Sequence, residues 1–200
     1  MSDSNGPGGA GQPGPDGGLC REERESLLEV AEASIRAGLD TGRPLDPQPE
    51  HFPAGLLEPG ATFVTLKLNG NLRGCVGSFE AYRPLLEDVA RNAFAAAFRD
   101  HRFSPLTWDE MKGLEVHVSL LTPLIPLSVK NRQELIQNLR PGVDGLLLED
   151  PPHRSTFLPQ VWEALPDPER FLSELFLKAG LSETHWSDTL TFSRYGVEEF

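Results

Sequence analysis

The chain has 200 residues, of which 38% are apolar and 24% are charged, and its 18 Lys and Arg against 30 Asp and Glu give a formal net charge of −12. A chain of this length suits one domain and buries roughly 70% of its unfolded surface, so its stability requires no disulfide or metal. The acidic balance argues against nucleic acid as a partner, because binding to phosphates requires a basic footprint.

The cysteines, the histidines and the lengths of the apolar runs exclude several further classes of protein. Cys20 and Cys75 are too few and too far apart for a disulfide scaffold or a CxxC site, and the five histidines lack metal-ligand spacing. The longest apolar run, residues 93–98, is far shorter than the ~20 residues that span a bilayer, and no secretory signal is recognisable. We therefore expect a soluble protein of the reducing cytoplasm with no cofactor, no metal and no membrane partner.

The first part of the chain predicts a tail, a helix and a long connection. Residues 1–18 hold seven glycines and three prolines, so we predict a disordered tail in front of a single domain of residues 19–200. From Arg21, apolar residues at positions 27, 31, 35 and 39 follow a helical period. Residues 41–60 contain five prolines and no periodicity, which predicts a long surface connection.

Residues 61–77 carry the clearest local signal, that of a β-hairpin. Alternating apolar residues lead to Asn69-Gly70, and Asn-Gly between two strand-like runs predicts a type I′ turn. With a two-residue loop and unbroken pairing, Leu66 would oppose Arg73. Arg73 and Cys75 would then project from the same face of the second strand, about 7 Å apart along it.

The rest of the chain alternates helices and strands without a strict β-α-β rhythm. The pattern predicts a largely apolar central helix after Pro84 and capped helices after Thr107, Asn131 and Asp167. Strands are predicted at residues 116–120, 146–148, 155–158 and 189–195. Because the best-marked pair is a hairpin, an α+β fold with an antiparallel sheet flanked by helices is favoured.

The strand Leu72-Arg73-Gly74-Cys75-Val76-Gly77 is the first candidate for chemistry. An arginine beside a thiol favours the thiolate, which is the reactive form of cysteine. Gly74 and Gly77 weaken a strand, so each is expected to allow a ligand or another backbone to approach. These features predict a site for a small anionic or electrophilic ligand, with Cys75 and Arg73 as catalytic candidates. The alternative is that Cys75 is a small buried hydrophobe and that the glycines serve packing.

Charges and a loop histidine extend this candidate site. Residues 73–102 hold five arginines against four acids within an acidic chain, so they could receive a carboxylate or phosphate, although solvated helix charges would give the same pattern. If the loop after the central helix packs beside the hairpin, His101 and Glu80 could complete a Cys-His-acid arrangement. Glu80 and Arg102 are further candidates for the rim of the ligand site.

Several co-linear segments resemble the AMMECR domain family, and the resemblance covers about residues 21–200. The matching segments are residues 63–66, 70–77, 102–106, 141–146, 156–162 and 195–200. The family's Leu-Arg-Gly-Cys stretch maps onto Leu72, Arg73, Gly74 and Cys75. His101 stands where a proline is expected in many relatives.

The resemblance implies a compact α+β domain whose larger lobe surrounds an antiparallel sheet and carries a smaller second lobe packed on it. It also implies an association with Memo-like and radical S-adenosylmethionine proteins, as the first component of a three-part system. No settled activity accompanies the family. The leading hypothesis is therefore an accessory protein or small enzyme with a ligand site at residues 72–75, and the alternative is a non-catalytic interaction module that docks a partner through the hairpin or residues 41–60.

Overall fold

The computed structural model describes residues 18–200, which form two compact units. The larger unit comprises the described residues up to Leu120 together with Glu198–Phe200, and the smaller one comprises Leu121–Val197. Each unit is built on an antiparallel four-stranded sheet with helices beside it, which confirms the α+β fold class. Apart from Gly18, the predicted disordered tail lies outside the described residues.

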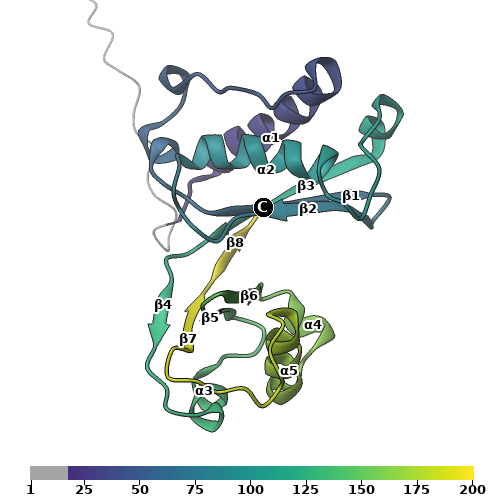
Figure 1. The fold of residues 1–200 in the computed structure, drawn as a ribbon. Coiled ribbons are helices and arrows are strands. Elements are labelled where there is room, and N and C mark those ends of the chain that lie inside the picture. Colours follow the sequence, from purple (N-terminus) through teal and green to yellow (C-terminus); the bar gives the residue numbers. More distant parts are fainter. Residues whose placement is uncertain (1–17) are drawn as a thin grey trace, which may run out of the picture. The chain divides into compact units, whose positions relative to one another are not determined.

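The larger unit is a sheet covered on one face by two helices (Figure 1). Its strands have the order β2-β1-β3-β8. Its main elements are α1 (Arg21–Thr41), β1 (Thr62–Leu68), β2 (Asn71–Gly77), α2 (Leu85–Phe98), β3 (Leu114–Leu121) and β8 (Val197–Glu199). Three short 3-10 helices complete it: η1 (Pro49–His51), η2 (Ala54–Leu57) and η3 (Trp108–Gly113).

The two helices pack against each other through apolar residues of α1 and small residues of α2. α1 follows the predicted period, with Leu27, Ala31 and Ile35 fully buried, and it ends at Gly42 with a left-handed φ of 71°. α2 buries Ala93 and Ala97 between α1 and the sheet. Small side chains let a helix approach its neighbours closely, so the apolar stripe of α2 forms the centre of the core.

The hairpin forms as predicted, but its register is not the predicted one. Asn69 and Gly70 have φ values of 52° and 77°, as a type I′ turn requires. A bulge then leaves Arg73 without a paired residue, so Leu66 opposes Gly74 instead of Arg73. Because Leu66 is fully buried and cross-strand partners share a face, unbroken pairing would place the Arg73 guanidinium in the core beneath α2. The bulge places a glycine there instead.

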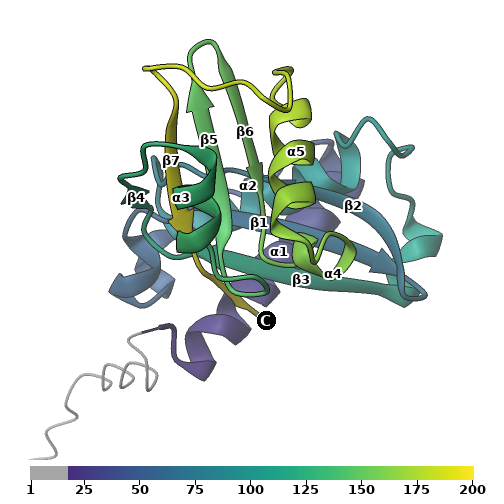
Figure 2. The same cartoon turned by 90° about the horizontal axis from the view of Figure 1, so that it is seen from below.

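The smaller unit has the strand order β4-β7-β5-β6, with α5 lying along β6 (Figure 2). Its elements are β4 (Ile125–Leu127), α3 (Arg132–Asn138), β5 (Gly145–Asp150), β6 (His153–Phe157), α4 (Val161–Ala164), α5 (Pro168–Lys178) and β7 (Thr191–Tyr195). The predicted caps are present, since Asn131 and Asp167 accept hydrogen bonds from the third residue of their helices. Trp162 stacks on Phe171 in this unit's core, with ring centroids 3.8 Å apart.

The helices of residues 18–200 include none with both the length and the hydropathy needed to cross a membrane.

Candidate functional site

Cys75 lies in β2 and is half-buried. It pairs with Thr65 of β1, whose hydroxyl donates a hydrogen bond to the Cys75 Sγ over 3.4 Å. Gly74 contacts the backbone of α2, and strand side chains alternate between faces, so Cys75 and Thr65 lie on the sheet face opposite the helices. The thiol is therefore outside the aliphatic core, in a polar and partly accessible position.

The loop after α2 returns to β2 and places an ion pair against the backbone of Cys75. Asp100 Oδ2 accepts a hydrogen bond from the Cys75 backbone N–H over 2.9 Å and forms an ion pair with Arg102 Nη2 at 2.6 Å. Arg102 Nη2 also lies 3.4 Å from the Cys75 carbonyl oxygen. The Arg102 guanidinium holds the pKa of Asp100 well below its usual range. Because the Arg102 side chain is 57% exposed, its charge stays accessible to a ligand.

The Arg73 guanidinium was predicted to bind an anionic ligand. In the structure it binds groups of the protein itself. Its Nε and Nη2 donate to the two carboxylate oxygens of Glu110 over 2.7 and 3.2 Å, and Nη2 also donates to the Ser104 carbonyl oxygen. The remaining nitrogen, Nη1, is buried and makes no hydrogen bond within the described chain. A forked pair of this kind is a strong positioning contact. Arg73 therefore fixes the segment of residues 104–110 against β2.

The two glycines of the strand are crowded by protein atoms. A Cβ at Gly74 would lie 2.1 Å from the Ala96 carbonyl oxygen of α2, and one at Gly77 would lie 2.3 Å from the Phe63 ring. The backbone of α2 therefore occupies the space beside Gly74, and the Phe63 side chain occupies the space beside Gly77. These contacts are those expected if the two glycines serve packing, the alternative to a role in ligand binding.

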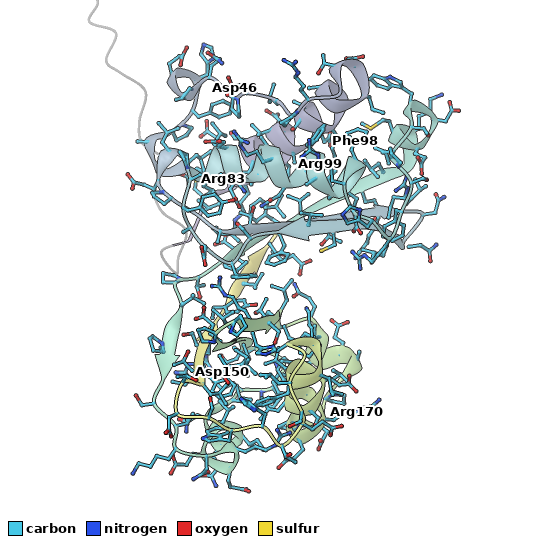
Figure 3. All side chains as sticks on the ribbon, in the orientation of Figure 1. Asp46, Arg83, Phe98, Arg99, Asp150 and Arg170 are labelled. Carbon is cyan, nitrogen blue, oxygen red and sulfur yellow. The ribbon has the colours of Figure 1, made fainter. Side chains whose placement is uncertain are left out.

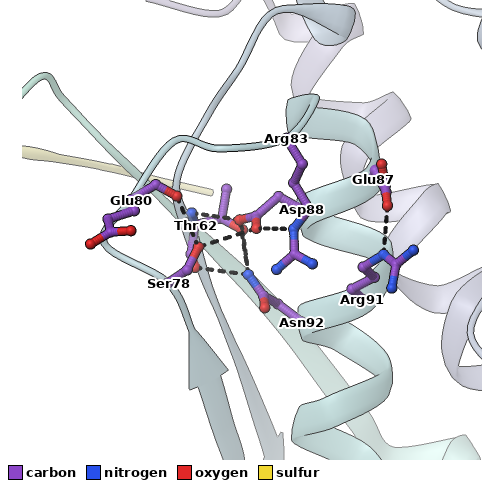
Figure 4. Close-up of polar contacts among 8 residues, drawn as sticks. All are labelled: Thr62, Ser78, Glu80, Arg83, Glu87, Asp88, Arg91 and Asn92. Atoms are coloured by element: carbon purple, nitrogen blue, oxygen red, sulfur yellow. Dashed lines mark hydrogen bonds and ion pairs between the residues drawn. The ribbon is translucent and has the colours of Figure 1, made fainter.

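His101 and Glu80 do not join Cys75 in a hydrogen-bonded relay. His101 is exposed in the loop after α2, and within residues 18–200 no hydrogen bond or ion pair links it to Cys75 or Glu80. Glu80 lies in the connection between β2 and α2, where its carbonyl oxygen is 3.5 Å from the Ser78 hydroxyl (Figure 4). The acid that the fold brings to Cys75 is Asp100.

The sequence analysis missed three residues that bind the predicted site residues. Thr65 and Asp100 bind Cys75, and Glu110 binds Arg73. The Thr107–Glu110 capping box was a usable signal, and it is present in η3, with the Thr107 N–H donating to Glu110 Oε2 over 2.9 Å. The pattern could not show that the same carboxylate also receives Arg73, because that contact joins residues 37 positions apart.

The Arg73–Glu110 pair predicts a specific loss of stability in acid. Hydrogen bonds from Arg73 lower the pKa of Glu110 from 4.5 to about 2. A depressed folded-state pKa adds stability that is complete above pH 4.5 and is lost as the pH falls towards 2. We expect Glu110→Gln to be less stable than the wild type at pH 7 and to show a shallower decline of the unfolding free energy below pH 4.5, measured by urea unfolding at each pH.

The same change in an exposed ion pair provides the control. Glu32→Gln removes the partner of Arg36 on the surface of α1. Exposed helix pairs contribute about 0.3–0.5 kcal/mol, so this variant should follow the wild-type pH profile closely. Parallel profiles for Glu110→Gln and the wild type would contradict the assignment.

A second polar cluster lies in the smaller unit. Asp150 accepts hydrogen bonds from His185 Nε2 at 2.5 Å, from the Ser187 hydroxyl at 2.9 Å and from the Thr189 hydroxyl. The hydroxyl of Thr189 and the ring of His185 lower the pKa of Asp150 to about 2. Ser187 and His185 both bind the carboxylate rather than each other, so the cluster is not a Ser-His-Asp relay. It ties the loop before β7 to the end of β5.

Potential metal ligands do not converge in the part of the chain that the structure describes, since residues 18–200 contain no group of three or more His, Cys, Asp or Glu that could hold a metal ion.

Comparison with known proteins identifies the family to which this geometry belongs. The AMMECR1 family model matches residues 28–200. The chain belongs to the AMMECR1 family. The matched region contains the smaller unit, the larger unit from Leu28 onwards and all residues around Cys75, so the family resemblance of the sequence is confirmed.

The relatives of this AMMECR1 family chain are similar over most of their length. A protein of Methanothermobacter thermautotrophicus is 37% identical over 168 residues, covering 82% of this chain and 85% of that protein. Protein SSO0193 of Saccharolobus solfataricus is 38% identical over 177 residues, covering 86% of this chain and 77% of that protein. The crystal structure of the uncharacterised protein PH0010 from Pyrococcus horikoshii matches with a TM-score of 0.81 and 32% identity, covering 89% of this chain and 90% of that one.

Proposed function

We propose that this AMMECR1 family protein is an accessory protein or small enzyme that binds a small anionic or electrophilic ligand at Cys75. The observation that carries the proposal is a half-buried thiol that accepts a hydrogen bond from Thr65, in a residue whose backbone binds Asp100 and the exposed Arg102. Reactive cysteines lie in partly exposed positions near a basic side chain, whereas structural cysteines are buried and inert.

Each residue of the cluster has a distinct role in this proposal. Cys75 contacts the ligand or attacks it as the thiolate, and Arg102 supplies the positive charge for a carboxylate or phosphate. Asp100 is a positioning residue, because it holds both Arg102 and the Cys75 backbone. His101 is exposed on the same loop and, like Glu80, remains a candidate for the rim.

We further propose that the protein acts together with Memo-like and radical S-adenosylmethionine proteins. Membership of the AMMECR1 family is what supports these partners. An anionic ligand site on an accessory protein would suit the transfer of a small charged intermediate between such components.

Alkylation kinetics test the ligand site. In a Cys20→Ser background, which leaves one thiol, we expect iodoacetamide to react with Cys75 about three- to tenfold more slowly after Arg102→Ala, because the nearby positive charge favours the thiolate. Inorganic phosphate or acetate should slow the reaction of the parent protein, as followed by intact-mass spectrometry.

The control is Arg91→Ala, which removes an exposed arginine paired with Glu87 on α2. It should leave the alkylation rate unchanged. Equal rates for the parent and Arg102→Ala, without protection by either anion, would refute the ligand site. Arg102 is preferred to Arg73 for this test, since the buried Arg73–Glu110 pair supports the fold itself.

A non-catalytic interaction module is the second candidate, and exposed apolar side chains favour it. Leu72 at the start of β2 is 45% exposed and Trp108 in η3 is 52% exposed. Titration calorimetry with a Memo-like protein measures docking, an activity assay of the assembled system measures ligand handling, and the two together distinguish the functions. A docking module predicts unchanged affinity for Cys75→Ser and weaker binding for Leu72→Ser, whereas a ligand-handling protein predicts that Cys75→Ser abolishes activity of the assembled system.

A further inference from the structure

The connection between α1 and β1 forms a pocket with the first turn of α2. The pocket has a volume of about 360 Å³ and is lined by residues 46–49 and Leu57 on one side and by Pro84, Leu86 and Glu87 on the other. All of these residues belong to the larger unit, and none takes part in the cluster around Cys75. We infer that this pocket binds a lysine or arginine side chain, together with a neighbouring apolar side chain, from an extended segment of a partner protein.

Hydrogen bonds and prolines hold the walls of the pocket in place. The buried Ser34 hydroxyl accepts from the Leu45 N–H over 3.1 Å and donates to the Ala90 carbonyl oxygen over 2.6 Å, which ties the connection to α2. On the other side, the Leu85 N–H donates to the Glu58 carbonyl oxygen over 2.9 Å. Proline also has a fixed φ, and Pro47, Pro49 and Pro84 line the pocket. A site that exists before binding loses little entropy when a ligand enters.

The charges at the pocket select a cation. Its two charged lining residues, Asp46 and Glu87, are both acidic. Glu87 is paired with the exposed Arg91 at 2.6 Å (Figure 4), whereas the carboxylate of Asp46 makes no hydrogen bond or ion pair within residues 18–200. Asp46 lies on the surface of the connection (Figure 3). The chain's net charge of −12 also draws cations towards it.

The lining and the size of the pocket identify the kind of cation. Leu57, Leu86 and three prolines give it apolar walls, which favour an alkyl stem over a hydrated inorganic ion. Its volume lies at the small end of ligand pockets, which range over roughly 300–1,000 Å³. This space suits one or two side chains. A basic side chain can pair with the Asp46 carboxylate while a neighbouring apolar side chain contacts the apolar walls. The pocket therefore suits short segments in which a basic residue is next to an apolar one.

Titration of the ¹⁵N-labelled full chain with the peptide acetyl-Leu-Arg-amide tests this inference. We expect saturable shifts confined to the backbone amides of Asp46, Gln48, Leu57 and residues 85–88. Acetyl-Leu-Glu-amide should cause no such shifts, and acetyl-Gly-Arg-amide should bind more weakly because it lacks the apolar side chain. Asp46→Asn should weaken binding about three- to fivefold, the effect of losing one exposed ion pair.

Asp188→Asn is the matched control, because Asp188 is also exposed and lies in the smaller unit. It makes the same change in net charge and should leave the affinity unchanged. Absence of saturable shifts at millimolar acetyl-Leu-Arg-amide would overturn the inference. So would equal weakening by the two substitutions, since that outcome indicates general attraction to an acidic chain. Neither variant alters Cys75 or Arg102, so failure here leaves the proposed ligand site intact.

Discussion

Replacing Gly74 by alanine is expected to destabilise the protein by about 3 kcal/mol or more, the upper end of the cost of overpacking a core. The new Cβ would lie 2.1 Å from the Ala96 carbonyl oxygen and 3.0 Å from its carbonyl carbon. Both atoms belong to the backbone of α2, so no side-chain rotation can relieve the clash. Alanine is otherwise as acceptable as glycine in a strand, so a loss of stability reports the contact with the helix.

Gly113→Ala is the control for this prediction. Gly113 ends η3 in the same unit, and a Cβ there would meet its nearest atoms at 3.5 Å, an ordinary contact distance. We expect its stability to stay within about 0.5 kcal/mol of the wild type, as for most surface substitutions. Urea unfolding followed by circular dichroism gives both values. A Gly74→Ala protein as stable as Gly113→Ala would show that β2 and α2 can separate without cost.

The second large effect is expected for Asp88→Asn, with a loss of about 3–5 kcal/mol. Asp88 is fully buried in the first turn of α2 and accepts five hydrogen bonds (Figure 4). The donors are the Thr62 N–H and hydroxyl, the Asn92 amide, the Ser78 hydroxyl and the Arg83 Nε. An asparagine replaces one carboxylate oxygen by an NH₂ group that faces these donors, and it leaves the charge of Arg83 without its partner.

The neighbouring Glu87→Gln is the control, because it makes the corresponding change one residue away. Glu87 forms an exposed pair with Arg91, so this variant should lose no more than about 0.5 kcal/mol. Equal stabilities of Asp88→Asn and Glu87→Gln would show that the buried network contributes little. If Asp88→Asn fails to fold, the conservative Thr62→Ser retains the hydroxyl donor and should cost far less than Thr62→Val.

The local features of the hairpin were predictable, whereas its register was not. Asn69-Gly70 specifies its turn through the positive φ values of those two residues, which is a property of the backbone alone. The bulge at Arg73 depends on what lies above the sheet. Only once α2 covers β2 does it matter which residue faces the helix, and Gly74 is the one that fits against Ala96.

In the candidate site, too, some residues were predictable from the sequence, whereas their partners were not. The sequence predicted Cys75 as a catalytic candidate and Arg102 as a rim candidate, and the structure places Arg102 Nη2 3.4 Å from the Cys75 carbonyl oxygen. The sequence analysis assigned the anion-binding role to Arg73, whose guanidinium is used by Glu110. It also proposed Glu80 as the acid, although Asp100 binds the Cys75 backbone. Such partners lie 25 to 37 residues apart, beyond any local pattern.

The sequence alone determined helices α1, α2, η3, α3 and α5, the caps, the hairpin turn and the α+β class, because periodicity, capping boxes and positive-φ turns depend on residues only a few positions apart. The tertiary structure decided the bulge, the partners of Arg73 and Cys75, and the pairing that brings Phe200 beside Val118, with N–H to O distances of 2.8 and 3.1 Å between their backbones. These features arise from contacts between distant segments. Their energies depend on burial and on which polar groups lack other partners, and both exist only when the whole chain has folded.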